Sequence, residues 1–477
     1  MTPRGPLTPD ATRPSREPLT PAAVAVTAGV VMLVLVFDAR VGSVLGMAAA
    51  AFFAARAGMW WLGATAAAWA AAFTAVLVFP GPYDSFAGPA AMPVLAAFVG
   101  CFLGGWAIGR KLESTRQTRR VHVASVGGAG SVGLAGSEKP AAVKRPLLVW
   151  PSERRLRLYL GGVLFVAFVS AVLRFRGTLP PVLASNPDVA REALSHRDNI
   201  YTGVLGQAWT LGLAVALLRT VAGEARHRWL YAALAVVFAG GAALGASKNA
   251  VLVGIVPALI AALSTRRPPG RKAPKVRPAL AVTLIGGFAV LLVVILGGQR
   301  TLAGEGIFED EFRARYGSNP ALASVASLDL SLSSSTETFG RLWQQRDAVP
   351  HGHGAYSLKF AGRPGERLVG HTDMYLITSQ LSMPYFMNTA TFAAIPLLDF
   401  GPAGAAVYLL VVGLVVGLVD RRLQGSTGPA QHLARAFVVY YAAFGIYEFY
   451  VALQPFWLGL APGLLALFLM GRPRRAG

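Results

Sequence analysis

Three side chains that could accept a proton lie close together in the stretch RPGERLVGHTDMYL. They are Glu366, His371 and Asp373. A carboxylate or an imidazole within hydrogen-bond reach can remove the proton of an attacking hydroxyl group, which is general base catalysis. His371 and Asp373 would point the same way on an extended segment, but not on a helix. If residues 371–380 are helical, Asp373 lies in the first turn, where its charge simply favours the helix dipole.

A further acid, Asp399, stands alone in the apolar stretch NTATFAAIPLLDFGPAG, residues 388–404. A charge at the centre of a bilayer is costly, so we expect this residue at a break between helices, at the membrane face. Asn388 or the threonine after it can cap a short helix that Pro396 ends, and Gly401 can cap the next helix. Asp399 would then orient an arginine or the local backbone, or would act on a substrate directly.

The elements that position these residues are expected to be membrane-spanning helices. The 477 residues are 54% hydrophobic and only 14% charged, with a mean hydropathy of +0.51, whereas about a quarter of a soluble chain is charged. The single cysteine, Cys101, excludes an intramolecular disulfide framework and a thiolate metal cluster. We predict an all-α polytopic protein whose roughly twelve spans lie near residues 22–37, 41–55, 59–79, 87–109, 158–173, 201–221, 229–246, 249–264, 279–298, 403–419, 436–453 and 455–470.

The net charge of +21 follows this layout and does not indicate a nucleic-acid partner. Most of the 44 Lys and Arg residues fall in the segments that are cytoplasmic if the N-terminus is inside. We therefore expect a multi-pass protein of the cytoplasmic membrane with both termini in the cytoplasm. The expected regions are a tail at 1–21, four spans at 22–109, a basic cytoplasmic loop at 110–157, central spans at 158–298, an outer loop at 299–388, C-terminal spans at 389–470 and a basic tail at 471–477.

We expect different roles for the two long loops. Residues 110–157 are rich in Gly, Ala and Ser with basic flanks, which indicates a flexible linker that sets orientation or contacts anionic lipid headgroups. Residues 299–388 are much longer than ordinary connections, and such loops are usually functional, here as a cover for an active site. In this loop His351 and His353 of HGHGAY suit a turn, and without a third ligand we expect no metal site.

The spans themselves are almost free of charge, which argues against a transporter with ionisable groups at the membrane midplane. The chemistry is then expected at the outer surface of the membrane. Nucleotides are not supplied there, so a transferase would need an activated donor that is linked to a membrane lipid.

The stretch NTATFAAIPLLDFGPAG followed by VYLLVVGLVVGLV resembles the C-terminal signature of bacterial oligosaccharide repeat-unit polymerases, the O-antigen polymerase type of membrane protein. In that family an Asn, a nearby Thr and an Asp-Phe-Gly precede a glycine-spaced helix. The matching positions are Asn388, Thr389, Thr391, Asp399, Phe400, Gly401 and Gly404. GASKNAVLVGIVPALIA is similar to a second family pattern through Ser247 and Lys248. The resemblance implies a GT-C-like helical architecture with one large outer loop.

The resemblance also implies a membrane glycosyltransferase that moves a growing glycan from one polyprenyl diphosphate onto the sugar of another lipid-linked repeat unit. Its partners would be these donor and acceptor lipids, membrane lipids, a flippase and a chain-length regulator, with no cofactor. The leaving diphosphate needs cations, and arginine donors match phosphate oxygens in pairs. Arg300, at the exit of a span, is the first candidate, followed by Lys248, Arg197, Arg341, Arg363 and Arg367. Glu366, His371 or Asp373 would be the base, and Asn388, Thr391, Asp399 and Gly401 would shape the site.

Two alternatives stay open. A ligase-like enzyme of the same chemistry would transfer the finished glycan to a different acceptor. A flippase or exporter of polar lipids or glycans would instead line a central path with charged residues and depend on an ion gradient.

Overall fold

Every regular element in the described part of the chain is helical. The computed structural model describes residues 38–78, 91–126, 148–184, 200–222, 227–245, 248–265, 317–349, 352–357, 390–446 and 454–471, with a few isolated positions between them. The helices are α2 (Ala39–Arg56), α3 (Trp60–Val78), α4 (Ala91–Val126), α5 (Glu153–Phe175), α7 (Ile200–Ala222), α8 (Arg228–Ala243), α9 (Lys248–Leu263), α12 (Pro320–Gln344), α15 (Ala394–Gln424), α16 (Pro429–Ala443) and α17 (Gln454–Gly471), with 3-10 turns η1 (Pro181–Leu183) and η4 (Phe444–Ile446). The all-α fold expected from the sequence is confirmed for these residues.

The helices have the length and surface of membrane spans. Among the described residues, α2, α3, α4, α5, α7 and α15 contain segments long and apolar enough to cross a bilayer, and α8, α9 and α17 contain shorter apolar helices. Phe165 and Phe168 of α5 and Val236 of α8 point outward and are 69%, 61% and 72% exposed. Contact with lipid chains would remove this apolar surface from water. These features fit a multi-pass helical membrane protein.

The helix bounds agree with most of the expected spans, and α16 is the clearest exception. Its span was expected at 436–453, but the helix begins at Pro429 and ends at Ala443. Proline suits the first helical position because the N–H it lacks would have no partner there. The first half of α16 also carries His432 and Arg435. These polar residues lower the hydropathy of the segment, so it is not recognised as part of a span. The expected span at 279–298, residues 447–453 of the span expected at 436–453, and all but isolated positions of the span expected at 22–37 lie outside the described residues.

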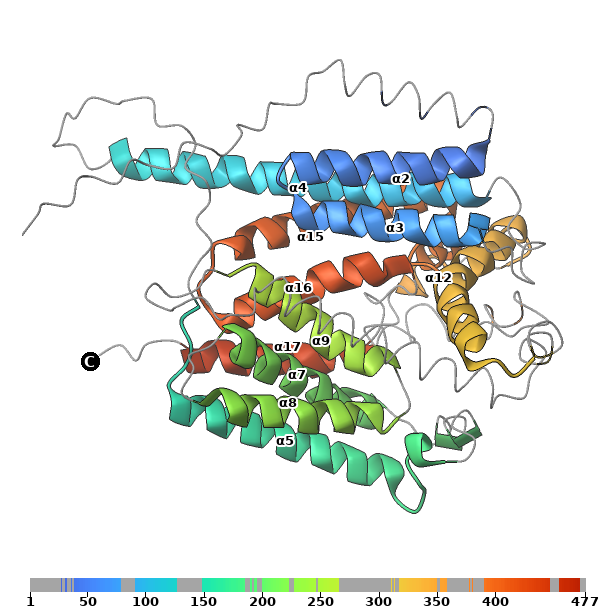
Figure 1. The fold of residues 1–477 in the computed structure, drawn as a ribbon. Helices are drawn as coiled ribbons and strands as arrows, with labels where there is room; N and C mark the ends of the chain where they lie inside the picture. The colour runs from blue at the N-terminus through green and yellow to red at the C-terminus, as the bar shows by residue number, and fades with distance from the viewer. Residues whose placement is uncertain are drawn as a thin grey trace, which may run out of the picture.

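The helices run side by side across the view of Figure 1 and form one bundle. On one side, α2 packs on α3 and α4, and α4 packs on α15; on the other, α5, α8 and α17 contact α7. Between the two sides α16 contacts both α9 and α15. One end of the bundle carries α12, which packs on α3 and α4, and is named the α12 end. At the opposite end, where α15 reaches Asp420, α4 extends beyond its neighbours; this is named the Asp420 end.

Facing glycines bring α4 and α15 into backbone contact. Each helix carries a pair spaced by four residues, Gly105 with Gly109 and Gly413 with Gly417. A Cβ atom on any of the four would overlap a carbonyl oxygen of the other helix. Those oxygens belong to Leu410, Leu414, Phe102 and Trp106. Small residues at this spacing let helices approach closely in a membrane, where van der Waals packing drives their association.

The segment 110–157, expected to be a flexible linker, begins as a helix. α4 continues without interruption to Val126, well past the end of its apolar part. The polar stretch RKLESTRQTRR is rich in Arg, Lys, Glu and Gln, which are good helix formers even where nothing apolar is buried. Composition alone had suggested a linker because the Gly-rich part of the segment dominates it.

The segment 299–388, expected to be one long loop, contains the 25-residue helix α12. Asn319 caps this helix, since its side chain accepts hydrogen bonds from the N–H groups of Ala321 (3.0 Å) and Leu322 (3.4 Å). Pro320 follows at the first helical position. Phe339 anchors the helix to the bundle through an edge-on contact with Phe98 of α4 (6.3 Å between ring centres).

Candidate functional site

Asp399 holds a turn of the segment that precedes α15. Its carboxylate is buried, with the residue 2% exposed. Oδ1 accepts a hydrogen bond from the N–H of Tyr356 (3.1 Å), and Oδ2 accepts from the N–H (2.7 Å) and the hydroxyl (2.5 Å) of Ser357. A buried charge needs such partners, and here the backbone supplies two of the three. These contacts correspond to the role in which Asp399 orients the local backbone.

The held turn, residues 352–357, depends on close backbone packing. The N–H of Gly352 donates to the carbonyl of Leu398 (3.0 Å), and the N–H of Ala355 donates back to Gly352 (2.8 Å). A Cβ atom at position 352 would overlap Asp399 Oδ1 and the ring of Tyr356, so only glycine fits there.

His353 follows in the left-handed region, with a φ of 47°. It is the only non-glycine residue with a positive φ among the described residues. Its neighbour Gly354 has a φ of 97°. The HGHGAY stretch is therefore a turn over its described part, while His351 lies outside the described residues. Within the described ranges, no three His, Cys, Asp or Glu side chains gather where they could hold a metal ion.

Gly401, two residues after Asp399, breaks α15. Its φ of 68° and ψ of −177° are not helical, so two helical pieces meet there, with Pro402 opening the second piece. This placement agrees with the expected boundary at Gly401. Pro396 has a different place from the one expected: it lies in the first turn of α15, which starts at Ala394, and does not end a helix. Proline is tolerated in a first turn because the N–H groups of that turn have no partner within the helix.

Thr391 and Phe392 seat the start of α15 in the core. The N–H of Phe392 donates to the carbonyl of Gly445 in η4 (2.7 Å), and its ring contacts Trp69 and Phe102, each at 5.3 Å between centres. Thr391 is 1% exposed, and its Oγ1 has no hydrogen-bond partner among the described residues. A buried hydroxyl without a partner is unfavourable. Thr391, one of the positions that carry the family resemblance, therefore has a hydroxyl that no described residue uses.

α12 brings a polar stretch into the protein interior that the sequence reasoning missed. All residues from Ser333 to Thr338 are buried, and Glu337 among them is 2% exposed. Arg341 lies one helical turn after Glu337, so the two side chains share a face of α12. The signal was present in SSSTET, where a single acid interrupts a Ser/Thr run between apolar residues.

Most of the candidates proposed from sequence fall outside the described residues. They are His371, Asp373, Glu366, Arg300, Arg197, Arg363, Arg367 and Asn388. Lys248 is the first residue of α9, and its side chain is not among the described ones. Thr391, Asp399 and Gly401 lie together at the start of α15, and Arg341 lies on α12 at the same end of the bundle.

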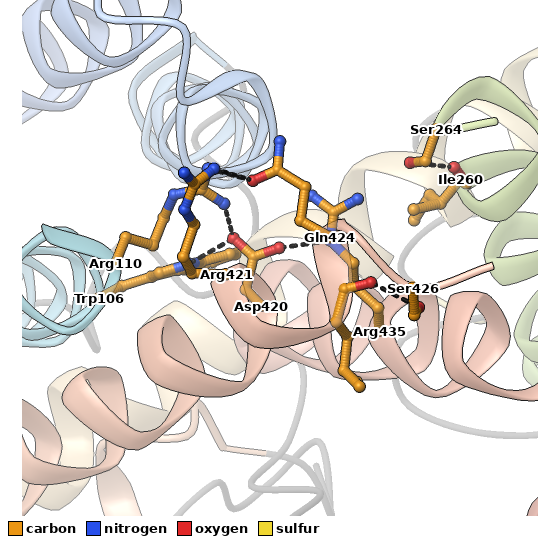
Figure 2. A network of polar contacts seen from close by, with 10 residues as sticks. Trp106, Arg110, Ile260, Ser264, Asp420, Arg421, Gln424, Ser426 and Arg435 are labelled. Atoms are coloured by element: carbon orange, nitrogen blue, oxygen red, sulfur yellow. Dashed lines mark hydrogen bonds and ion pairs between the residues drawn. The ribbon is translucent and has the colours of Figure 1, made fainter. Parts of the chain in front are cut away.

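A second polar cluster, which was not expected, occupies the Asp420 end (Figure 2). Asp420 is fully buried and accepts hydrogen bonds from Trp106 Nε1 (3.1 Å), from Arg110 and from Arg435 Nε (2.6 Å). Gln424 Oε1 accepts from Arg110 Nη2 and from Arg421, each at 3.0 Å. The cluster joins α4, α15 and α16, and its signal in the sequence was a lone Asp placed before two arginines.

No family model, no curated protein and no solved structure matches this chain.

Proposed function

We propose that this chain is a membrane glycosyltransferase that polymerises polyprenyl-diphosphate-linked oligosaccharide repeat units at the outer face of the cytoplasmic membrane. The motif that resembles such polymerases is the start of α15. The observation that carries the proposal is the clamp between Asp399 and the turn at 352–357. It ties a long polar segment to the end of an apolar bundle, where a lipid-borne substrate would present its sugars.

The proposed architecture is GT-C-like with about twelve spans and both termini in the cytoplasm. The Asp420 end would face the cytoplasm. Support comes from its arginines, which lie on several helices and follow the positive-inside rule: Arg56, Arg110, Arg155, Arg219, Arg421 and Arg422. The α12 end would then face outward, with the candidate site.

The distribution of charge along the described spans favours surface chemistry over transport. α15 carries acids only near its two ends, at Asp399 and Asp420, and α4 carries charged residues only from Arg110 onward. A transporter that binds a polar substrate at the membrane midplane would need ionisable side chains there, or a break in a helix that leaves backbone groups free to bind the substrate. The break at Gly401 lies near the start of α15, which runs from Ala394 to Gln424, and not halfway along it.

In the proposed reaction, a sugar hydroxyl of the acceptor attacks the anomeric carbon of the donor glycan. The bond between that carbon and the diphosphate oxygen breaks, and the lipid diphosphate leaves with the electron pair. Arg300, assisted by Lys248 and Arg341, would stabilise the charge on the leaving group. His371, Asp373 or Glu366 would take the proton of the attacking hydroxyl. Asp399 would act as a positioning residue that fixes the segment carrying these groups.

The test uses the purified full chain in detergent with the repeat-unit lipid isolated from the same organism. Polymerisation predicts a ladder of longer lipid-linked glycans without any ion gradient. A parallel sample in vesicles measures movement of the same lipid between leaflets. If no ladder forms while the lipid is moved, the chain is a flippase and the proposal is wrong. If a finished glycan passes only to an added foreign acceptor, the ligase alternative replaces it.

A further inference from the structure

The cluster at the Asp420 end holds more positive than negative charge. Three guanidinium groups, of Arg110, Arg421 and Arg435, gather around the carboxylate of Asp420. Among the described residues, the other acid that acts on Arg421 electrostatically is Glu113, which is 8% exposed. Counted over these described side chains, three cations against two anions leave one positive charge in excess. Buried charges are normally paired, so the cluster is short of one anion.

Within the part of the chain that the structure describes, Arg421 and Arg435 also retain donors that no protein group uses. The side chain of Arg435 is 6% exposed, and within the described residues it donates only its Nε–H, to Asp420. Arg421 donates through Nη1 to Gln424, while its buried Nε meets no acceptor among the described residues. Gln424 is already shared, since Arg110 donates to the same oxygen. Arg421 is only partly buried as a residue, but its Nε and the guanidinium of Arg435 are shielded from water, and such N–H groups are unfavourable unless an acceptor reaches them.

The position of the cluster suggests what can reach it. Asp420 and Arg421 lie in the last turn of the apolar helix α15, where a spanning helix meets the headgroup layer. On the preceding turns α15 exposes an apolar stripe of Val407, Val411 and Val415, which are 62%, 53% and 51% exposed. An acyl chain along this stripe would reach the same end of α15 as the arginines, so its headgroup would lie near that end of the helix.

We propose that Arg421 and Arg435 bind a phosphate group at the Asp420 end, with Asp420 and Gln424 holding the guanidinium groups in place. Phosphate carries several oxygens on one centre and can accept from two arginines at once, whereas a carboxylate offers only two oxygens. Basic pockets between membrane helices on the cytoplasmic side are known to suit anionic headgroups. This site is separate from the proposed transferase site and does not depend on it.

The experiment compares the full chain in neutral detergent with added phosphatidylglycerol, phosphatidylcholine or inorganic phosphate. Thermal unfolding and lipid occupancy in native mass spectrometry are both recorded. We expect phosphatidylglycerol to raise the unfolding temperature of the wild type. It should bind the wild type at least about tenfold more tightly than it binds Arg421→Gln or Arg435→Gln, because each substitution removes charge-assisted hydrogen bonds. Arg116→Gln, an exposed arginine of α4 at the same end, removes the same charge and should keep the binding.

The same measurements distinguish a lipid headgroup from a free phosphate ion as the ligand. If inorganic phosphate alone reproduces the shift with the same dependence on Arg421 and Arg435, the ligand is a free phosphate; if only phosphatidylglycerol does, it is a lipid headgroup. Equal stabilisation by both lipids, or binding that Arg116→Gln weakens as much as Arg421→Gln does, would overturn the site. Should Arg435→Gln fail to fold, Arg421→Gln still decides, because it leaves both ion pairs of Asp420 intact.

Discussion

At the scale of single residues, Asp399 and Asp420 show two ways of burying a carboxylate near the end of an apolar helix. Asp399 is satisfied by two backbone N–H groups and a hydroxyl, so it shapes a turn. Asp420 is satisfied by two arginines and an indole, so it joins helices. The sequence indicates that Asp399 belongs to a break, because Gly401 and a proline follow it. It does not reveal the donors, which are backbone groups about forty positions away.

Asp399→Ala should destabilise the protein by about 3 kcal/mol, because it leaves the N–H groups of Tyr356 and Ser357 buried without an acceptor. We expect a lower unfolding temperature in detergent and loss of glycan elongation. Thr391→Val is the matched control for stability: it removes a buried hydroxyl that has no partner among the described residues. It should leave the unfolding temperature unchanged or raise it. An Asp399→Ala protein as stable as the wild type would show that the clamp is unimportant.

At the scale of elements, the interface between α4 and α15 positions both polar ends of α15. The two glycine pairs could be recognised in the sequence as small residues spaced by four, but their partners could not. α12 was missed as a helix because its buried stretch, Ser333–Thr338, is polar on every side of the helix, so no apolar stripe marks it there. The helical extension of α4 was missed for the related reason that no apolar face marks it.

Gly413→Ala should separate α4 from α15, because the new methyl group would overlap the carbonyl oxygen of Phe102. Overpacking of this kind costs about 1 to 3 kcal/mol. The control is Gly104→Ala, next to Gly105 on α4, where a Cβ atom meets nothing within 4 Å. Unfolding temperatures of the two variants in the same detergent give the comparison. Equal values would mean that the two helices are not held together by these glycines.

At the scale of the whole molecule, composition and charge placement were enough to predict an all-helical membrane protein and most of its helix bounds. Apolar runs of spanning length can be recognised directly, because a chain in lipid must satisfy its backbone hydrogen bonds internally and a helix does so within one segment. What the sequence could not predict is which polar residues from distant helices meet, as Trp106, Arg110, Asp420 and Arg435 do. Such contacts depend on how the helices pack, and no local pattern encodes that packing.

We propose that the α12 end transfers glycan to a lipid-linked acceptor, with arginine at the leaving diphosphate. The most direct measurement is the length distribution of lipid-linked glycans formed from the purified repeat unit by wild type, Arg300→Ala and Arg313→Ala. Arg313 pairs with Asp310 within the same segment and serves as the matched control. We expect ladders from wild type and Arg313→Ala, and none from an Arg300→Ala protein that is expressed and folded normally. Equal ladders from all three would remove Arg300 from the site, and no ladder from the wild type would contradict the proposed polymerisation.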